Sequence, residues 1–143
     1  MKKLVLACVL IAAVYALTRF DFRNEAVVRS GAGSSQTLVE AIEHRRSNVV
    51  VEGQGVVTKI LPDDNNGSRH QRFILRLPTG GTVLIAHNID LAPKIQSLRT
   101  GDTVSFEGEY KWNPKGGLIH WTHRDPEGRH PGGWLKHGGE TFQ

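Results

Sequence analysis

Residues 48–61 read NVVVEGQGVVTKIL, and this stretch decides the predicted fold. It is rich in β-branched residues, which favour strands, and it is interrupted by Gly53 and Gly55. Glycines inside a strand often mark a bulge or a sharp bend. We therefore predict one long strand that bends at its glycines, as it must if it serves both halves of a closed barrel.

Four further strand patterns follow, separated by turn-rich segments. The alternation is clearest in RHQRFILRL, residues 69–77, where Phe73, Leu75 and Leu77 share one face. The other predicted strands cover residues 82–89, 103–112 and 118–123. The tail also predicts a small hairpin around Gly138-Gly139.

Two short helices complete the predicted domain. TLVEAIEHRR, residues 37–46, places Leu38, Ala41 and Ile42 in an apolar stripe and predicts an amphipathic helix before the first strand. APKIQSL, residues 92–98, predicts a short helix between the third and fourth strands. This order predicts a mainly β fold, a small five-stranded OB-like barrel. Another kind of small β-barrel is the alternative.

The N-terminus has the pattern of a secretory signal. Two lysines precede an apolar run in MKKLVLACVLIAAVYAL, and the run is short for a helix that must cross about 30 Å of hydrocarbon. We predict a signal peptide or N-terminal anchor over residues 1–19, a spacer over 20–36 and a single domain over 37–143. The protein is then exported, either periplasmic or anchored in the inner membrane and facing the periplasm, with membrane contact only through this segment. Cys8, the only cysteine, falls in the signal, so the domain has no disulfide.

The charge balance argues against a general nucleic-acid-binding protein. The chain has 18 Lys and Arg against 14 Asp and Glu. Without Lys2, Lys3 and Arg19 of the N-terminal segment, 15 basic residues face 14 acidic ones, a net charge of +1. General affinity for nucleic acids comes mainly from neutralising phosphates, and a protein built for it is strongly basic.

Several stretches together resemble a known family. They are VVEGQGVVTKILPDDNNGSRHQRFILRL, LIAHNIDLAP, GEYKWNPKGGLIHWTHRDP and GGWLKH, which cover most of residues 48–143. The resemblance is to a bacterial family of small exported proteins classed as a domain of unknown function. It implies a single exported domain and brings no reaction, cofactor or partner.

The second and third strands of an OB-fold, with the loops at their ends, usually form its ligand face. Here Arg72 and Arg76 would hold a phosphate or carboxylate, and Trp112 would stack on a ring. His87 and His120 would donate hydrogen bonds or make binding pH-sensitive. The predicted binding set is Arg72, Arg76, His87, Trp112, Lys115 and His120. Its expected ligand is an anionic small molecule or single-stranded nucleic acid. The alternative is that the arginines are solvated and the tryptophan covers a core edge.

The histidines suggest two further arrangements. If His70, His87 and His120 meet across neighbouring strands, they would form a cluster suited to proton transfer or metal binding. The alternative is three unrelated polar positions. The orientation of the third strand stays open: either Val83 and Ile85 face inward together with His87, or Leu84 and Ala86 face inward and His87 faces out.

A metal centre is the competing prediction. His120, His123, Asp125 and His130 could surround a divalent cation with an open position, as in a zinc hydrolase such as a nuclease. Their spacing matches no established zinc signature. The alternative is solvent-facing histidines that bond to backbone or carboxylates.

A third class of function is a protein-interaction module of the cell envelope. Its mark would be an exposed apolar patch near Trp134 and Phe142. The sequence therefore favours an exported binding domain and leaves a metal-dependent hydrolase and an interaction module as alternatives.

Overall fold

The computed structural model describes residues 37–143. The predicted signal or anchor over 1–19 and the predicted spacer over 20–36 lie outside the described residues. Within residues 37–143, no helix has the length and apolar character needed to cross a membrane.

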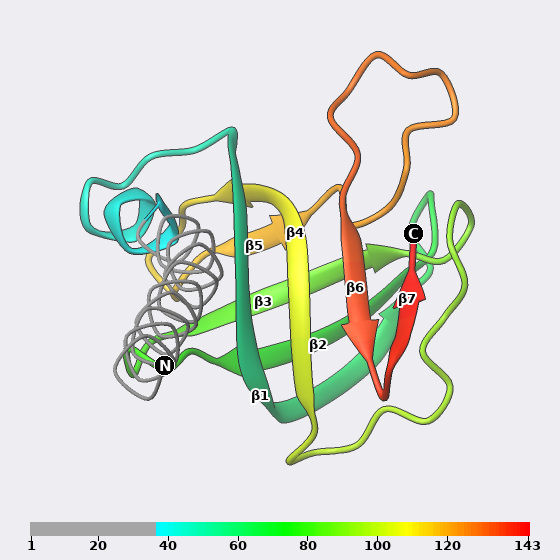
Figure 1. Ribbon diagram of the computed structural model, residues 1–143, viewed down its shortest axis with the longest axis horizontal. Coiled ribbons are helices and arrows are strands. Elements are labelled where there is room, and N and C mark those ends of the chain that lie inside the picture. The colour runs from blue at the N-terminus through cyan, green and yellow to red at the C-terminus, as the bar shows by residue number, and fades with distance from the viewer. Residues whose placement is uncertain (1–36) are drawn as a thin grey trace, which may run out of the picture. The chain divides into compact units, whose positions relative to one another are not determined.

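Seven strands form one mixed sheet (Figure 1). They are β1 (Val49–Asp64), β2 (His70–Arg76), β3 (Thr82–Asn88), β4 (Thr103–Lys111), β5 (Leu118–His120), β6 (Trp134–His137) and β7 (Glu140–Phe142). The strand order is β1-β2-β3-β5-β4-β6-β7, and an additional pairing joins β1 to β4. Five strands therefore make a near-ring, with β3 and β5 running parallel and the other pairs antiparallel.

The prediction of a long, shared first strand is confirmed. Residues from Val49 to Val56 pair with β4, and residues from Val56 to Asp64 pair with β2. A Cβ added to Gly53 would lie 2.9 Å from Cζ of Phe106. The glycines thus allow close packing where one strand changes partners.

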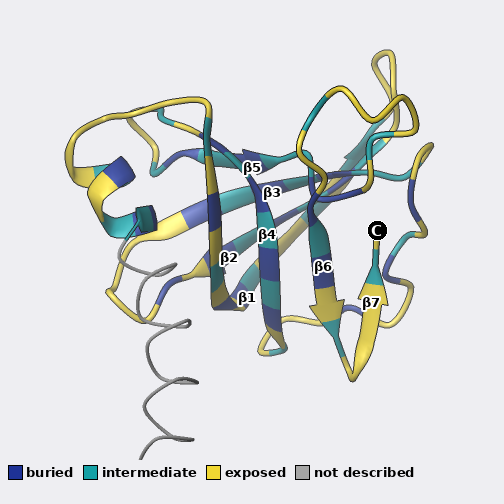
Figure 2. Cartoon of the chain, turned by 45° about the horizontal axis from the view of Figure 1, so that its top comes forward, coloured by how far each residue is buried: buried dark blue, intermediate teal, exposed yellow. Residues whose placement is uncertain are grey.

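The inside of the near-ring is the hydrophobic core. In Figure 2, buried and less buried residues alternate along β4, as expected for a strand with one face inward. The side chains that are fully buried include Phe73, Leu75, Ile85, Val104, Phe106, Tyr110, Ile119 and Leu135. The predicted inward face of residues 69–77 is confirmed.

The predicted amphipathic helix is present over residues 37–43. Leu38 and Ala41 are buried, and Ile42 packs against the core, so the helix covers part of the near-ring with its apolar stripe. The helix ends before Arg45, whose φ of 52° lies in the left-handed region.

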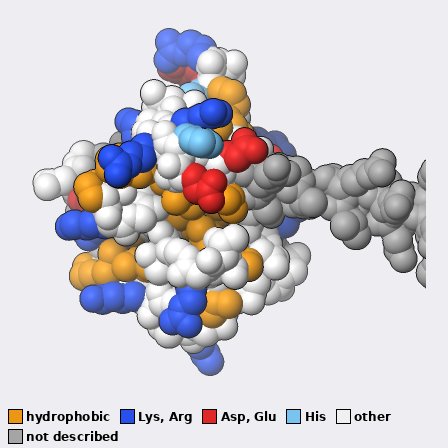
Figure 3. All heavy atoms as spheres, turned by 90° about the vertical axis from the view of Figure 1, so that its left-hand side faces the viewer, with side chains coloured by type: hydrophobic (Ala, Val, Ile, Leu, Met, Phe, Trp, Pro, Cys, Tyr) orange, Lys and Arg blue, Asp and Glu red, His pale blue; other side chains and the backbone are white. Residues whose placement is uncertain are grey.

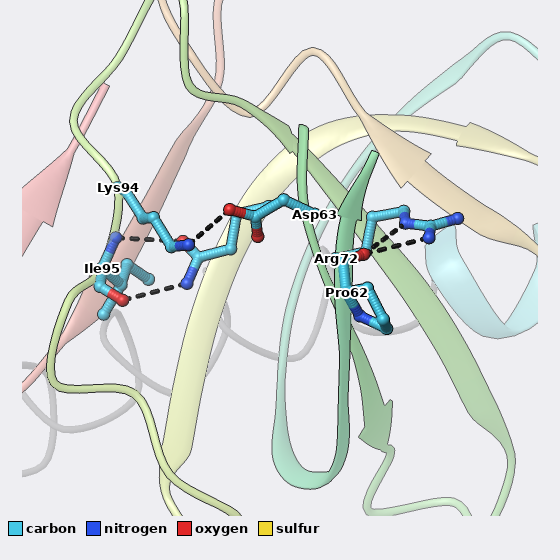
Figure 4. Close-up of polar contacts among 6 residues, drawn as sticks. Pro62, Asp63, Arg72, Lys94 and Ile95 are labelled. Carbon is cyan, nitrogen blue, oxygen red and sulfur yellow. Dashed lines mark hydrogen bonds and ion pairs between the residues drawn. The ribbon is translucent and has the colours of Figure 1, made fainter. Parts of the chain in front are cut away.

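The predicted helix over 92–98 is wrong, since residues 89–100 form turns and irregular structure. The Gln71 side chain accepts a hydrogen bond from the Ile95 backbone N–H and donates one to its carbonyl, both at 2.9 Å. These are the backbone groups that a helix would pair internally. Figure 4 shows the ion pair between Lys94 and Asp63 next to Ile95. Contacts with distant residues therefore replace the local helix, while Ile95 and Leu98 still point inward as expected.

The expected count of five strands also needs correction. The tail forms the predicted hairpin, with β6 and β7 joined at Gly138 and Gly139. β6 adds to β4 through the pairs Ser105–Lys136 and Glu107–Trp134. The sheet therefore extends beyond the near-ring by two strands.

Replacing Gly55 with alanine tests the change of partners in β1. The added Cβ would lie 2.7 Å from the Arg76 carbonyl oxygen and 2.9 Å from Leu75 Cβ. Because the obstruction is partly backbone, we expect urea denaturation to show a loss of about 1–3 kcal/mol in the free energy of unfolding. Gly81→Ala is the matched control, since its Cβ would meet nothing within 4 Å. An equal effect of both substitutions would contradict the proposed crowding.

Candidate functional site

A pocket of about 200 Å³ opens on the outer face of β2, β3 and β5. The parallel pairing joins Leu84 to Leu118 and Ile85 to Ile119, and the pocket lies just beyond it, at Ala86 and His120. The small Ala86 side chain leaves room there. The pocket, termed the outer pocket, is lined by Ser68, His70, Ala86, Asn88, Leu91, His120, Trp121 and His123.

Trp121 gives this pocket an unusual wall. Its φ of 54° lies in the left-handed region, which bulky residues rarely adopt. This conformation follows directly after the end of β5 at His120, and the next two residues, Thr122 and His123, are buried. The indole stacks on the ring of His130, with centroids 3.9 Å apart and planes at 10°. Such backbone strain concentrates at functional sites, so the strained Trp121 favours the outer pocket as a functional site.

The three histidines of the outer pocket are each held through one ring nitrogen. Nδ1 of His70 lies 2.8 Å from the Ser68 carbonyl oxygen, and Nδ1 of His123 lies 2.8 Å from the Arg124 carbonyl oxygen. A carbonyl only accepts, so both Nδ1 atoms carry the proton. His120 is held through Nε2 instead. In the described part of the chain, the second nitrogen of each ring makes no hydrogen bond.

Glu109 holds His120 and connects the outer pocket to the segment 121–133. Its Oε1 accepts a hydrogen bond from His120 Nε2 at 3.0 Å, and its Oε2 accepts one from His130 Nε2 at 2.8 Å. Burial raises the pKa of Glu109, but these two hydrogen bonds outweigh it and hold the pKa below its ordinary value. Burial lowers the pKa of His120, and the bond to Glu109 offsets this only in part. His120 thus donates its Nε2–H to a carboxylate, and the net lowering of its pKa favours the neutral ring.

The four predicted metal ligands have protein partners. The Asp125 carboxylate accepts three backbone N–H groups from residues 127–130 and shapes that turn. Nδ1 of His123 is bonded to a carbonyl, and His120 and His130 share the carboxylate described above. Among residues 37–143, no three His, Cys, Asp or Glu side chains are grouped so that they could hold a metal ion.

Two of the predicted binding residues lie on β2, outside the lining of the outer pocket. Arg72 turns toward β1, and its Nε and Nη2 donate to the Pro62 carbonyl oxygen at 3.1 and 2.9 Å (Figure 4). Arg76 is exposed at the other end of β2, opposite Thr82 of β3. His120 is the member of the predicted set that lines the pocket.

Trp112 and Lys115 lie at the end of β4 and in the turn that follows it. The Trp112 ring is half-buried against the core, and the Arg45 guanidinium lies 5.2 Å from its centroid. Lys115 is exposed. An arginine of this domain therefore already contacts the ring that was expected to stack on a ligand.

Sequence reasoning missed most of the outer pocket. The alternation of β2 predicts the outward position of His70. Ser68, Asn88 and Trp121 carried no pattern that singles them out. Glu109 occupies an outward position in the fourth strand, but its pairing with His120 depends on the register between β4 and β5.

His87 is fully buried in the core, and Val83 and Ile85 face inward with it. Its Nε2 donates to the Pro93 carbonyl oxygen at 3.1 Å, and its Nδ1 accepts from the Thr122 hydroxyl at 2.8 Å. Burial lowers the pKa of His87 from 6.5 to about 4, although the hydrogen bond to Pro93 opposes this. A neutral imidazole satisfies both contacts and ties β3 to residues 93 and 122.

We expect nitrogen-detected NMR to show a neutral His87 ring from about pH 8 to about pH 5. Because the folded-state pKa of about 4 lies below 6.5, this group stabilises the fold fully above pH 6.5, and the stabilisation declines as the pH falls toward 4. The loss amounts to about 3 kcal/mol at most, which urea denaturation at neutral and acid pH can measure. Titration of the His87 ring near pH 6.5 would contradict this assignment.

Comparison with known proteins identifies a family and no individual relative. A family model described as "Protein of unknown function (DUF3465)" matches residues 25–143. Neither the curated proteins nor the solved structures contain a match to this chain. Since the family model covers most of the sequence, the chain belongs to the DUF3465 family.

Proposed function

We propose that this chain is an exported domain of the OB type that binds a small anionic ligand in the outer pocket. The observation that carries the proposal is the meeting of His70, His120 and His123 around one pocket, each ring anchored through one nitrogen. Anchoring leaves the second nitrogen of each ring for a ligand. In an imidazolium both ring nitrogens donate, so the second nitrogen of His70 or His123 can then give a charge-assisted hydrogen bond to an anion.

Other groups in the outer pocket also favour an acceptor-rich ligand. The side-chain oxygen of Asn88 accepts a hydrogen bond from the Asp90 backbone N–H at 2.9 Å. This contact leaves the amide NH₂ of Asn88 to donate. The Ser68 hydroxyl lines the same pocket and can donate as well. A phosphate or carboxylate accepts from several such donors at once.

The strand arrangement supports the OB assignment. β1 pairs with both β2 and β4, and β3 with β5, which closes five strands into a near-ring. OB-folds use the outer face of their second and third strands and the adjoining loops to bind ligands. The outer pocket contains residues of β2 and β3 together with Ser68 from the loop between β1 and β2. This analogy supports the location of a site and not the identity of its ligand.

The size of the pocket and the spread of charge favour a small anion over a nucleic-acid strand. At about 200 Å³ the outer pocket is smaller than sites for drug-sized ligands. Figure 3 shows one face of the molecule, on which Lys and Arg side chains lie scattered among hydrophobic and acidic ones. A strand-binding protein needs a continuous basic groove instead.

Titration of the full chain with inorganic phosphate at about pH 6 tests this function. We expect saturable binding by calorimetry, with NMR shift changes at His70, Asn88 and the Trp121 indole. His70→Ala should weaken the affinity about tenfold, because it removes one hydrogen bond to the anion. His44→Ala is the control, since His44 is exposed and does not line the pocket.

Two outcomes would overturn the proposal. One is that phosphate, citrate and adenosine monophosphate all leave the spectra of the pocket residues unchanged. The other is that a labelled single-stranded oligonucleotide binds in a salt-sensitive manner while the small anions do not. The second result would favour a nucleic-acid partner.

A further inference from the structure

The Glu109 carboxylate links two parts of the chain that are separate in sequence. His120 is the last residue of β5, and His130 lies in the segment 121–133 between β5 and β6. Both donate to this one carboxylate, at 3.0 and 2.8 Å. The side chain of Glu109 is 14 % exposed, so water competes little for these contacts.

The partners of His130 require it to be charged. Its Nδ1 lies 2.7 Å from the Pro131 carbonyl oxygen, and its Nε2 lies 2.8 Å from Oε2 of Glu109. A carbonyl and a carboxylate only accept hydrogen bonds, whereas a neutral imidazole has a single N–H. Both contacts can therefore form together only when His130 is an imidazolium.

His130 also supports the wall of the outer pocket. Its ring stacks on Trp121, and Trp121 lines the pocket. The end of the segment is held separately, because the Gly133 backbone N–H donates to the His123 carbonyl at 2.9 Å. Release of His130 from Glu109 would remove the support of Trp121 without detaching the end of the segment.

We propose that His130 and Glu109 form a proton-dependent clamp that holds segment 121–133 and the Trp121 wall in place at the outer pocket. When His130 is protonated, the clamp is closed and the pocket has the shape described above. When the proton is lost, one of the two hydrogen bonds of His130 must break, and the wall is released. The effect of the clamp on ligand affinity rests on the proposed function, but the clamp itself does not.

The surrounding charges act in the same direction. Burial lowers the pKa of His130, but the hydrogen bonds to Glu109 and Pro131 outweigh it, and Asp125 adds to the net rise in pKa. His120 is the other group bonded to Glu109, and the nearby positive charge of Lys111 disfavours its protonation. The residue that pairs with Glu109 on β1 is the apolar Val50, which brings no charge to the carboxylate. Glu107, the preceding residue on the same face of β4, pairs with Trp134 of β6 and with Glu52 of β1, so these pairs bring no positive charge either.

The direction of the pH dependence follows from these shifts. Because the pKa of His130 is raised in the fold, its stabilising effect is complete below the ordinary imidazole pKa and is lost as the pH rises through the raised value. Because the pKa of Glu109 is lowered, its effect is present above the ordinary carboxyl pKa and is lost as the pH falls through the lowered value. The clamp is therefore closed at mildly acid pH and opens on the alkaline side.

Hydrogen exchange of the full chain between about pH 6 and about pH 9 tests the clamp. After correction for intrinsic exchange, we expect the amides of residues 124–132, apart from Pro126 and Pro131, to lose about tenfold in protection as the pH rises. Nitrogen-detected NMR should show the His130 imidazolium disappearing over the same range. Glu109→Gln should show low protection already at the acid end, with no further change as the pH rises.

His137→Gln is the matched control. It breaks another histidine–carboxylate pair, in which His137 Nε2 lies 2.8 Å from Oδ2 of Asp102, and it should leave exchange of segment 121–133 unchanged. His130→Phe is the second test variant, because it keeps an aromatic ring against Trp121 and removes the titrating proton. It should make protection independent of pH even if Glu109→Gln fails to fold.

Phosphate titrations of the same samples separate the two proposals. A pH-dependent loss of protection without any phosphate binding would overturn the proposed function and leave the clamp in place. Constant protection in the wild type, or an unchanged pH dependence in His130→Phe, would overturn the clamp whether or not phosphate binds.

Discussion

The change of partners by β1 is the constraint on which the rest of the structure depends. One strand pairs with β4 along its first half and with β2 along its second, and Val56 takes part in both ladders. The near-ring closes only because this strand can bend and pass close to its neighbours. Gly53 and Gly55 lie where side chains would meet Phe106 or the backbone of Arg76. Closure of the near-ring packs apolar side chains on the inner face of the sheet and leaves polar side chains on its outer face.

The outer pocket follows from where the pairing of β3 with β5 ends. β5 has three residues, and Trp121 turns the chain out of the sheet through a left-handed conformation. Its ring stacks on His130, which lies nine residues later and is bonded to the same carboxylate as His120. The strained residue is thereby held by stacking and electrostatics. In the proposed clamp, the position of Trp121 depends on protonated His130, so the shape of the outer pocket and the conformation of segment 121–133 change together.

Hydrogen-bond partners decide the roles of the histidines more than their spacing does. His87 has one donor and one acceptor as partners and suits a neutral ring in the core. His130 has two acceptors and suits a charged ring near the surface. Sequence spacing placed His120, His123 and His130 close together but could not distinguish a metal site from these separate roles. The decisive residue, Glu109, lies on another strand.

The sequence by itself determined the features that depend on local pattern. Alternation predicted the inner face of β2, the glycines predicted the bend of β1, and an apolar stripe predicted a helix over residues 37–46, of which residues 37–43 are helical. Tertiary structure decided the features that depend on distant partners. Gln71 prevents a helix at Ile95 by bonding its backbone, and the register of β4 against β5 brings Glu109 to His120. The physical reason is that periodicity reports which side of a strand is buried, whereas hydrogen bonds between distant residues form only after the chain has closed.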